Sequence, residues 1–298
     1  MNIKSLFTNL GKLLLCGVIF SIGTVIGGMV VTMLGLQPPS MPEGMDQQSV
    51  MLFMLLESPL SALILALLAR HLSGGFWART LILFLLSWIS NSVNNQIEAA
   101  AFAGMEEGFW FTVLTFLVPV LFVSMAVAWL FPPTDKSMFM DSVRSFFSRY
   151  SFGAWMWRFV LAAVIFMPIY YFFGMLVIPF TRSYYEQNMY GLEIPSLGKL
   201  LLILFVRSVL FFAVCLPVLI AWQGSRLNLL WRLGLALFYL VGFQSLLIAT
   251  WMPWALRLPH MIEIFFDEFV YAGALVRLFG IQKETTSQAK TYYQMVSR

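Results

Sequence analysis

The sequence is poor in charged residues. Only 11% of its 298 residues are Asp, Glu, Lys or Arg, against about 25% in an ordinary soluble domain. Hydrophobic residues make up 60%, and a soluble chain of this length cannot hide so much apolar surface, because its own surface needs polar cover. The shortage of charge therefore excludes a soluble globular protein and predicts an all-α integral membrane protein.

Cysteine is almost absent. Cys16 and Cys215 are too few for a disulfide framework, and both lie in apolar runs, where a thiol packs as a small hydrophobic group. The net charge of +4 does not indicate a nucleic-acid partner, because basic residues of membrane proteins gather in cytoplasmic loops. The lipid bilayer is the partner that the composition predicts, with another membrane protein or a second copy of the chain as further partners.

Eight apolar segments are long enough, in whole or in part, to cross a bilayer. A transmembrane helix needs about 20 mainly apolar residues. The sequence predicts one transmembrane domain over 1–298, a polytopic helix bundle with spans at 13–35, 49–70, 77–98, 109–131, 155–180, 197–222, 229–252 and 259–280. The last span has Glu263, Asp267 and Glu268 in its first half, so an interfacial or partly re-entrant helix is the alternative there.

Basic residues alternate between the connections. They gather before the first span, in every second connection and after the eighth span: Lys4, Lys12, Arg70, Arg79, Lys136, Arg144, Arg149, Arg158, Arg226, Arg232, Arg277, Lys283, Lys290 and Arg298. The positive-inside rule then places both termini in the cytoplasm. We expect a multi-pass protein of a cell membrane, by default the bacterial cytoplasmic membrane.

The longest connection, 132–153, begins with Pro132-Pro133, which ends the preceding helix. Beyond it, apolar residues alternate with arginines as in an amphipathic helix on the inner membrane surface. The connection would divide the chain into two four-span halves, but no repeat of fixed period is visible. Small residues at Gly17, Ser21, Gly23, Gly27 and Gly28 of the first span predict close packing on another helix of the same chain.

Polar residues recur inside three spans. In the third span they share one stripe at steps of three and four residues, which leaves Gln96 off the stripe. In the eighth span the second and third polar residues lie three and seven positions after the first, and the second span has a single carboxylate beside Pro59. The residues are Ser87, Asn91, Asn94, Asn95 and Glu98; His260, Glu263 and Asp267; and Glu57.

The predicted topology brings these residues to one depth in the outer half of the membrane. Ionisable groups inside a bilayer are costly, and several unpaired carboxylates at one depth would repel one another. Arg207, near the middle of the sixth span, is the internal cation, with Glu57 and Asp267 as its candidate partners. The alternative is that each polar residue only bonds a neighbouring helix. Because unpaired carboxylates at one depth would repel one another, we expect the polar residues to share an outward-facing polar cavity.

Three classes of function fit such a cavity. The first is non-catalytic binding of a small ligand, an ion or a partner helix. The second is an intramembrane hydrolase or transferase that acts on a lipid-linked or membrane substrate at the outer leaflet, with Glu98 or Glu263 as general base. Glu98, His260, Glu263 and Asp267 offer ligands of the kind that hold zinc or another divalent metal ion, although no HExxH motif is present. The third, a proton- or cation-coupled transporter, is disfavoured by the apolar inner halves of the spans.

Overall fold

The computed structural model describes residues 3–40, 45–104, 106–134 and 137–280. Its elements, in chain order, are α1 (Ile3–Met33), α2 (Gln47–Ala69), α3 (Phe76–Ser87), η1 (Trp88–Val93), α4 (Asn94–Phe102), α5 (Phe109–Thr115), α6 (Leu117–Leu130), α7 (Phe139–Phe147), α8 (Phe152–Val164), α9 (Phe166–Glu186), η2 (Met189–Gly191), α10 (Leu197–Ala221), α11 (Arg226–Phe238), η3 (Tyr239–Phe243), α12 (Gln244–Ile248) and α13 (Trp254–Phe279). No β-strand occurs among these described residues, so the predicted all-helical fold is confirmed.

Seven helical stretches are long and apolar enough to cross a membrane. They are Lys4–Met33, Gln48–Ala69, Phe76–Phe102, Phe109–Leu130, Phe152–Glu186, Leu197–Ala221 and Arg226–Ile248. The chain is therefore a multi-pass membrane protein. The eighth predicted span corresponds to α13, which has 26 residues but contains Arg257, Glu263, Asp267, Glu268 and Arg277, so composition alone does not mark it as a span. Lys136, Lys283, Lys290 and Arg298, which the predicted orientation used, lie outside the described residues.

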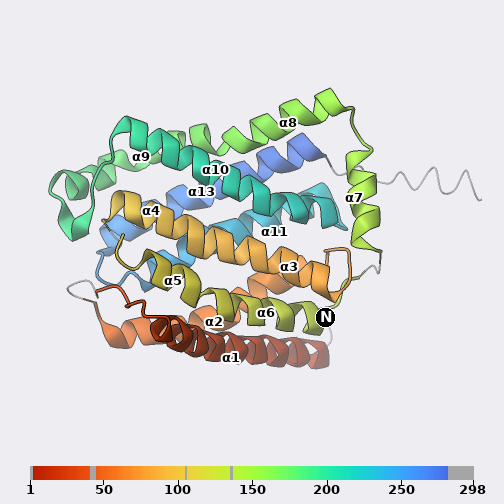
Figure 1. The fold of residues 1–298 in the computed structure, drawn as a ribbon, viewed down its shortest axis with the longest axis horizontal. Helices are drawn as coiled ribbons and strands as arrows, with labels where there is room; N and C mark the ends of the chain where they lie inside the picture. Colours follow the sequence, from red (N-terminus) through yellow and green to blue (C-terminus); the bar gives the residue numbers. More distant parts are fainter. Residues whose placement is uncertain (1–2, 41–44, 105, 135–136, 281–298) are drawn as a thin grey trace, which may run out of the picture.

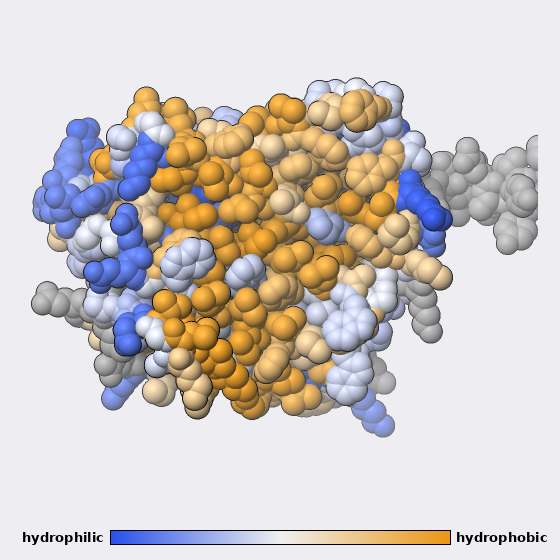
Figure 2. All heavy atoms as spheres, viewed as in Figure 1, coloured by the Kyte–Doolittle hydropathy of each residue, from blue (hydrophilic) through white to orange (hydrophobic). Residues whose placement is uncertain are grey.

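The surface has the distribution of polarity that a bilayer requires. Figure 2 shows hydrophobic residues across the middle of the visible face, with hydrophilic residues at the left and right ends. Large apolar side chains such as Val25, Phe172 and Leu202 are exposed by 53% to 64%. In water such contiguous apolar surface would be unstable, whereas lipid chains cover it.

Two of the long helical stretches contain a π-helical segment, each between two α-helical parts. In the first, η1 joins α3 to α4, and in the second, η3 joins α11 to α12. A π turn has more residues than an α turn, so side chains that follow it are rotated relative to those before it. Both helices therefore change, near their middle, which residues face the protein interior.

The two π segments belong to a structural repeat. α2 and α10 begin at Gln47 and Leu197, and α3 and α11 begin at Phe76 and Arg226; in both cases the second number is the first plus 150. Between them, the amide of Ser73 donates to the carbonyl of Ala221, and the amide of Gln223 donates to that of His71, each at 2.7 Å. The two donors, Ser73 and Gln223, are 150 residues apart, and so are the two acceptors, His71 and Ala221. Because α2 also packs on α11 and α12 as α10 packs on α3 and α4, an approximate two-fold axis passes between the two turns.

The repeat escaped the sequence analysis because few residue types match at this spacing. Glu57 corresponds to Arg207, Arg79 to Leu229 and Asn94 to Gln244. Either repeat needs only an apolar helix, a short turn and a second apolar helix, and many sequences meet that requirement. The repetition is one of backbone geometry.

The end of the bundle crossed by α7 collects basic side chains (Figure 1). They donate to carbonyls at helix ends: Arg79 to Ala69, Ala128 and Phe131, Lys12 to Leu130 at 2.9 Å, Arg232 to Leu67, Arg149 to Gly280 at 2.8 Å and Arg158 to Leu278 at 3.0 Å. The last carbonyls of a helix have no partner within it and carry partial negative charge. These basic residues therefore also cap helices that end there.

Candidate functional site

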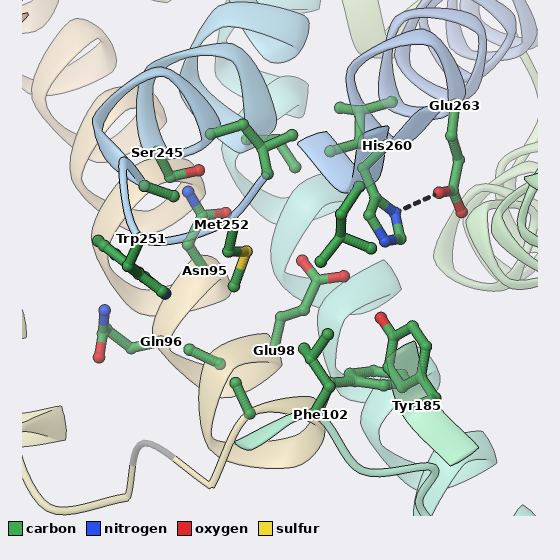
Figure 3. A pocket seen from close by; sticks show the side chains of 18 of the residues that line it. Asn95, Gln96, Glu98, Phe102, Tyr185, Ser245, Trp251, Met252, His260 and Glu263 are labelled. Atoms are coloured by element: carbon green, nitrogen blue, oxygen red, sulfur yellow. Dashed lines mark hydrogen bonds and ion pairs between the residues drawn. The ribbon is translucent and has the colours of Figure 1, made fainter. Parts of the chain in front are cut away.

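A pocket of about 280 Å³ opens between α4, α9, α12 and α13, at the end of the bundle opposite α7 (Figures 1 and 3). Its walls are largely apolar, with a few polar and aromatic groups among them, as in most small-molecule sites. Trp251 and Met252, from the connection between α12 and α13, lie at its edge. The polar and aromatic lining residues are Asn95, Gln96, Glu98, Tyr170, Tyr185, Ser245, Trp251, His260 and Glu263.

Glu98 is the pocket residue with the most complete set of partners. Nη2 of Arg207 donates to its Oε2 at 2.7 Å, and the Tyr170 hydroxyl donates to its Oε1 at 2.9 Å. Arg207 is fully buried, whereas the Glu98 side chain is 27% exposed. Two charge-assisted donors hold the ionised carboxylate in place, while its exposed part faces the pocket.

His260 and Glu263 form a second pair on α13. The two are three residues apart, so they lie on one face of the helix, and Nδ1 of His260 bonds Oε2 of Glu263 at 2.8 Å. The other oxygen of Glu263 lies against Gly174 of α9, where a Cβ atom would be only 3.2 Å away. Figure 3 shows Glu98 and His260 pointing into the pocket from facing walls.

The π segments help to shape this pocket. Nδ2 of Asn95 donates to the carbonyl of Leu240 in η3 at 3.1 Å and contacts Oδ1 of Asn91 at 3.4 Å. A π segment disturbs the usual hydrogen-bond ladder, and such segments are frequent at functional sites. In the first repeat, Gly23 and Gly27 let α1 approach Pro119 and Thr115 closely.

The structure brings together four of the nine predicted site residues. Asn95, Glu98, His260 and Glu263 line the pocket, and Arg207 lies directly behind it. The expected partners of Arg207, Glu57 and Asp267, were wrong as hydrogen-bond partners, because α10 packs on α4 and places Glu98 within reach. Asp267 is buried behind the pocket.

Three predicted residues lie elsewhere. Glu57 accepts a hydrogen bond from the Gln244 amide, on the far side of the two-fold axis. Asn91 contacts Asn95, and Asn94 is fully buried outside the pocket. The stripe included Asn94 and excluded Gln96, whereas Gln96 lines the pocket. Asn94 and Gln96 both lie in α4, and the face of α4 that lines the pocket is broader than the predicted stripe and displaced toward Asn95 and Ala99, so that it includes Gln96 and leaves out Asn94.

Sequence reasoning missed the aromatic residues of the site. Tyr170, Tyr185 and Trp251 line the pocket, but the chain has 29 Phe, 10 Tyr and 10 Trp residues. Nothing in their spacing separates these three from the aromatic residues that face lipid or the core. The polar stripes were visible because polar residues are scarce.

Among the described residues, no group of three His, Cys, Asp or Glu side chains is close enough to hold a metal ion. Comparison with protein-family models, with curated proteins and with solved structures found no match to this chain. The functional argument therefore depends on the chemistry of the pocket.

Proposed function

We propose that the chain is an eight-span membrane protein with both termini in the cytoplasm, and that its pocket opens toward the outer side. Two features of α13 support the eighth span. Its 26 residues suffice to cross a bilayer, and its acidic residues Glu263, Asp267 and Glu268 are buried in the protein. Charged side chains are tolerated within a membrane when they face the bundle interior. α7, with an apolar face and Arg144, would lie on the inner surface.

Cysteine labelling tests this orientation. Glu193 and Ser145 are exposed at opposite ends of the bundle, and both native cysteines are buried. In intact cells, a membrane-impermeant maleimide should label Glu193→Cys and leave Ser145→Cys unlabelled until the membrane is opened. Labelling of Ser145→Cys alone in intact cells would reverse the orientation.

The pocket binds a small amphipathic ligand that carries a cationic group. Its ionisable lining consists of Glu98, Glu263 and His260, with tyrosines beside them, while Arg207 is held behind Glu98. Carboxylates and aromatic faces together are the groups that recognise ammonium ions. The apolar remainder of the lining suits an alkyl or aryl part. The observation that carries this proposal is the exposed portion of Glu98, an ion-paired carboxylate aimed into an apolar pocket.

Matched ligands of equal size test the proposal. Hexylamine and hexanol have the same chain, but only hexylamine is cationic at neutral pH. We expect hexylamine to raise the Tm of the detergent-solubilised protein, and hexanol to have little effect. Glu98→Gln, which keeps the shape of the side chain, should remove the difference, whereas Glu193→Gln should not. Equal shifts with both compounds would exclude recognition of a cation at Glu98.

A hydrolase or transferase acting on a membrane substrate at the outer leaflet is the second candidate. The observation in its favour is the 2.8 Å contact of His260 with Glu263, which directs the other ring nitrogen to the pocket as a general base. The chain has only two histidines, so modification with diethyl pyrocarbonate followed by mass spectrometry can compare their reactivities. Glu263→Gln should slow modification of His260 and leave His71 unchanged; equal rates at His260 would remove this candidate.

A further inference from the structure

A cluster of buried ionisable groups lies behind the pocket. Asp267 and Glu268 of α13 are 2% and 0% exposed, and Arg207 of α10 is 0% exposed. Arg207 interacts electrostatically with both Glu98 and Glu268. The guanidinium therefore interacts with an acid that lines the pocket and with an acid that does not.

The ion pair with Glu98 uses only some of the hydrogen-bond donors of Arg207. Nη2 donates to Glu98, but Nε and Nη1 have no hydrogen-bond partner in the described part of the chain. Glu268 likewise has two oxygens without a partner there. A guanidinium has five N–H donors in a planar fork and often holds two acceptors at once. Arg207 thus has spare donors near an acid with spare acceptors.

The charges of the cluster do not balance if every acid is ionised. Arg207 supplies one positive charge, and Glu98, at 2.7 Å, already neutralises it. A carboxylate buried without a counter-ion takes up a proton, because desolvation penalises the charged form. With Arg207 engaged by Glu98, the neutral acid is therefore the stable form of Glu268.

We propose that Glu268 is a proton-binding site linked to the pocket through Arg207, so that a cationic group at Glu98 releases a proton from Glu268. The cation takes over the charge of Glu98, Arg207 turns its free nitrogens to Glu268, and Glu268 loses its proton to solvent in the pocket. One positive charge arrives and one leaves, so the net charge of the cluster is unchanged. The part concerning ligands depends on the proposed function, whereas the link between Glu98 and Glu268 does not.

The surroundings of Glu268 contain no second described cation that would replace Arg207. Cys215 of α10 and Tyr271 of α13 interact with Glu268 electrostatically. Asp267 also interacts with it, and Glu98 of α4 completes the set. All of these groups are neutral or acidic. The charge of Glu268 therefore depends on whether Arg207 pairs with Glu98 or with Glu268.

Infrared spectroscopy tests this link without any ligand. Protonated carboxyl groups give a C=O band that carboxylates lack. We expect Glu98→Gln, which frees Arg207, to reduce this band by the intensity of one carboxyl group, although Gln replaces an ionised acid. Glu268→Gln should cause the same loss, and the double variant should lose no more than either single variant. Glu193→Gln, which removes an exposed ionised acid, is the control and should change nothing.

Two results would overturn the proposal. The first is an unchanged C=O band in folded Glu98→Gln, because the protonation of Glu268 would then not depend on whether Arg207 is paired with Glu98. The second is an additive loss in the double variant. If Glu98→Gln fails to fold, the unmodified protein gives the answer: hexylamine added to a weakly buffered sample should release close to one proton per bound molecule, and binding without release contradicts the link. Absence of hexylamine binding with the expected infrared result would remove only the proposed ligand.

Discussion

Glu57 and Arg207 occupy equivalent positions in the two repeats, where one repeat has an acid and the other a base. Each lies ten residues after its helix begins, at Gln47 and Leu197. Glu57 accepts from Gln244 of the second repeat, and Arg207 donates to Glu98 of the first. The two repeats are thus joined by two crossing polar contacts, of which only one opens to the pocket.

The contact at Glu57 should behave as a structural hydrogen bond. Gln244→Leu leaves a buried carboxyl group without its donor, and we expect it to lower the free energy of unfolding by about 1–3 kcal/mol. Glu57→Gln keeps an acceptor of the same size and should cost less. Unfolding in mixed micelles measures both. A larger loss from Glu57→Gln than from Gln244→Leu would show that the charge of Glu57 matters.

The contact at Arg207 should behave as an ion pair. Removal of one partner of a buried pair is costly, by about 3–5 kcal/mol, and we expect somewhat less for Arg207→Leu because Glu98 is partly exposed. The double variant Arg207→Leu/Glu98→Leu removes both charges and should recover most of the loss. The same unfolding assay measures this coupling. Independent, additive effects would contradict it.

The class of fold followed from composition, and the positions of the helices followed from apolar runs. Hydropathy identifies membrane helices well because every backbone polar group must be satisfied within the helix. The repeat at residues 47–102 and 197–248 was not visible, since it depends on backbone geometry at Ser73 and Gln223. α13 shows the opposite case, a long helix with buried acids that composition does not mark as a span.

Sequence reasoning identified part of the lining of the pocket, whereas the predicted outward-facing polar cavity stays a prediction. Glu98, His260 and Glu263 stood out because ionisable groups are rare in apolar helices. Their partners depend on which helices pack together, and sequence does not show that α10 lies beside α4. The face of α4 that lines the pocket is also broader than the predicted stripe, so it includes Gln96.

His71 should make the turn at the two-fold axis sensitive to acid. Burial, followed by the charge of Arg232, lowers the pKa of His71 below its usual value, so the folded state keeps it neutral. The unfolded state binds a proton as the pH falls through about 6.5, and stability then falls with pH. We expect the Tm in detergent to decrease from about pH 8 to about pH 5.5. His71→Gln should weaken this decrease, and an unchanged decrease in this variant would contradict the role of His71.

Two neighbouring glycines of α1 provide the sharpest test of the packing. A Cβ atom on Gly27 would lie 2.2 Å from the Thr115 carbonyl oxygen, whereas a Cβ atom on Gly28 meets nothing within 4 Å. Gly27→Ala must push α1 away from α5, and overpacking of this kind costs about 1–3 kcal/mol. Gly28→Ala adds the same methyl group on the lipid-facing side and, because Ala favours helix more than Gly by about 1 kcal/mol, should leave stability unchanged or slightly higher. Unfolding of the two variants in the same micelles compares them directly, and equal stability would mean that α1 does not pack against α5 in this register.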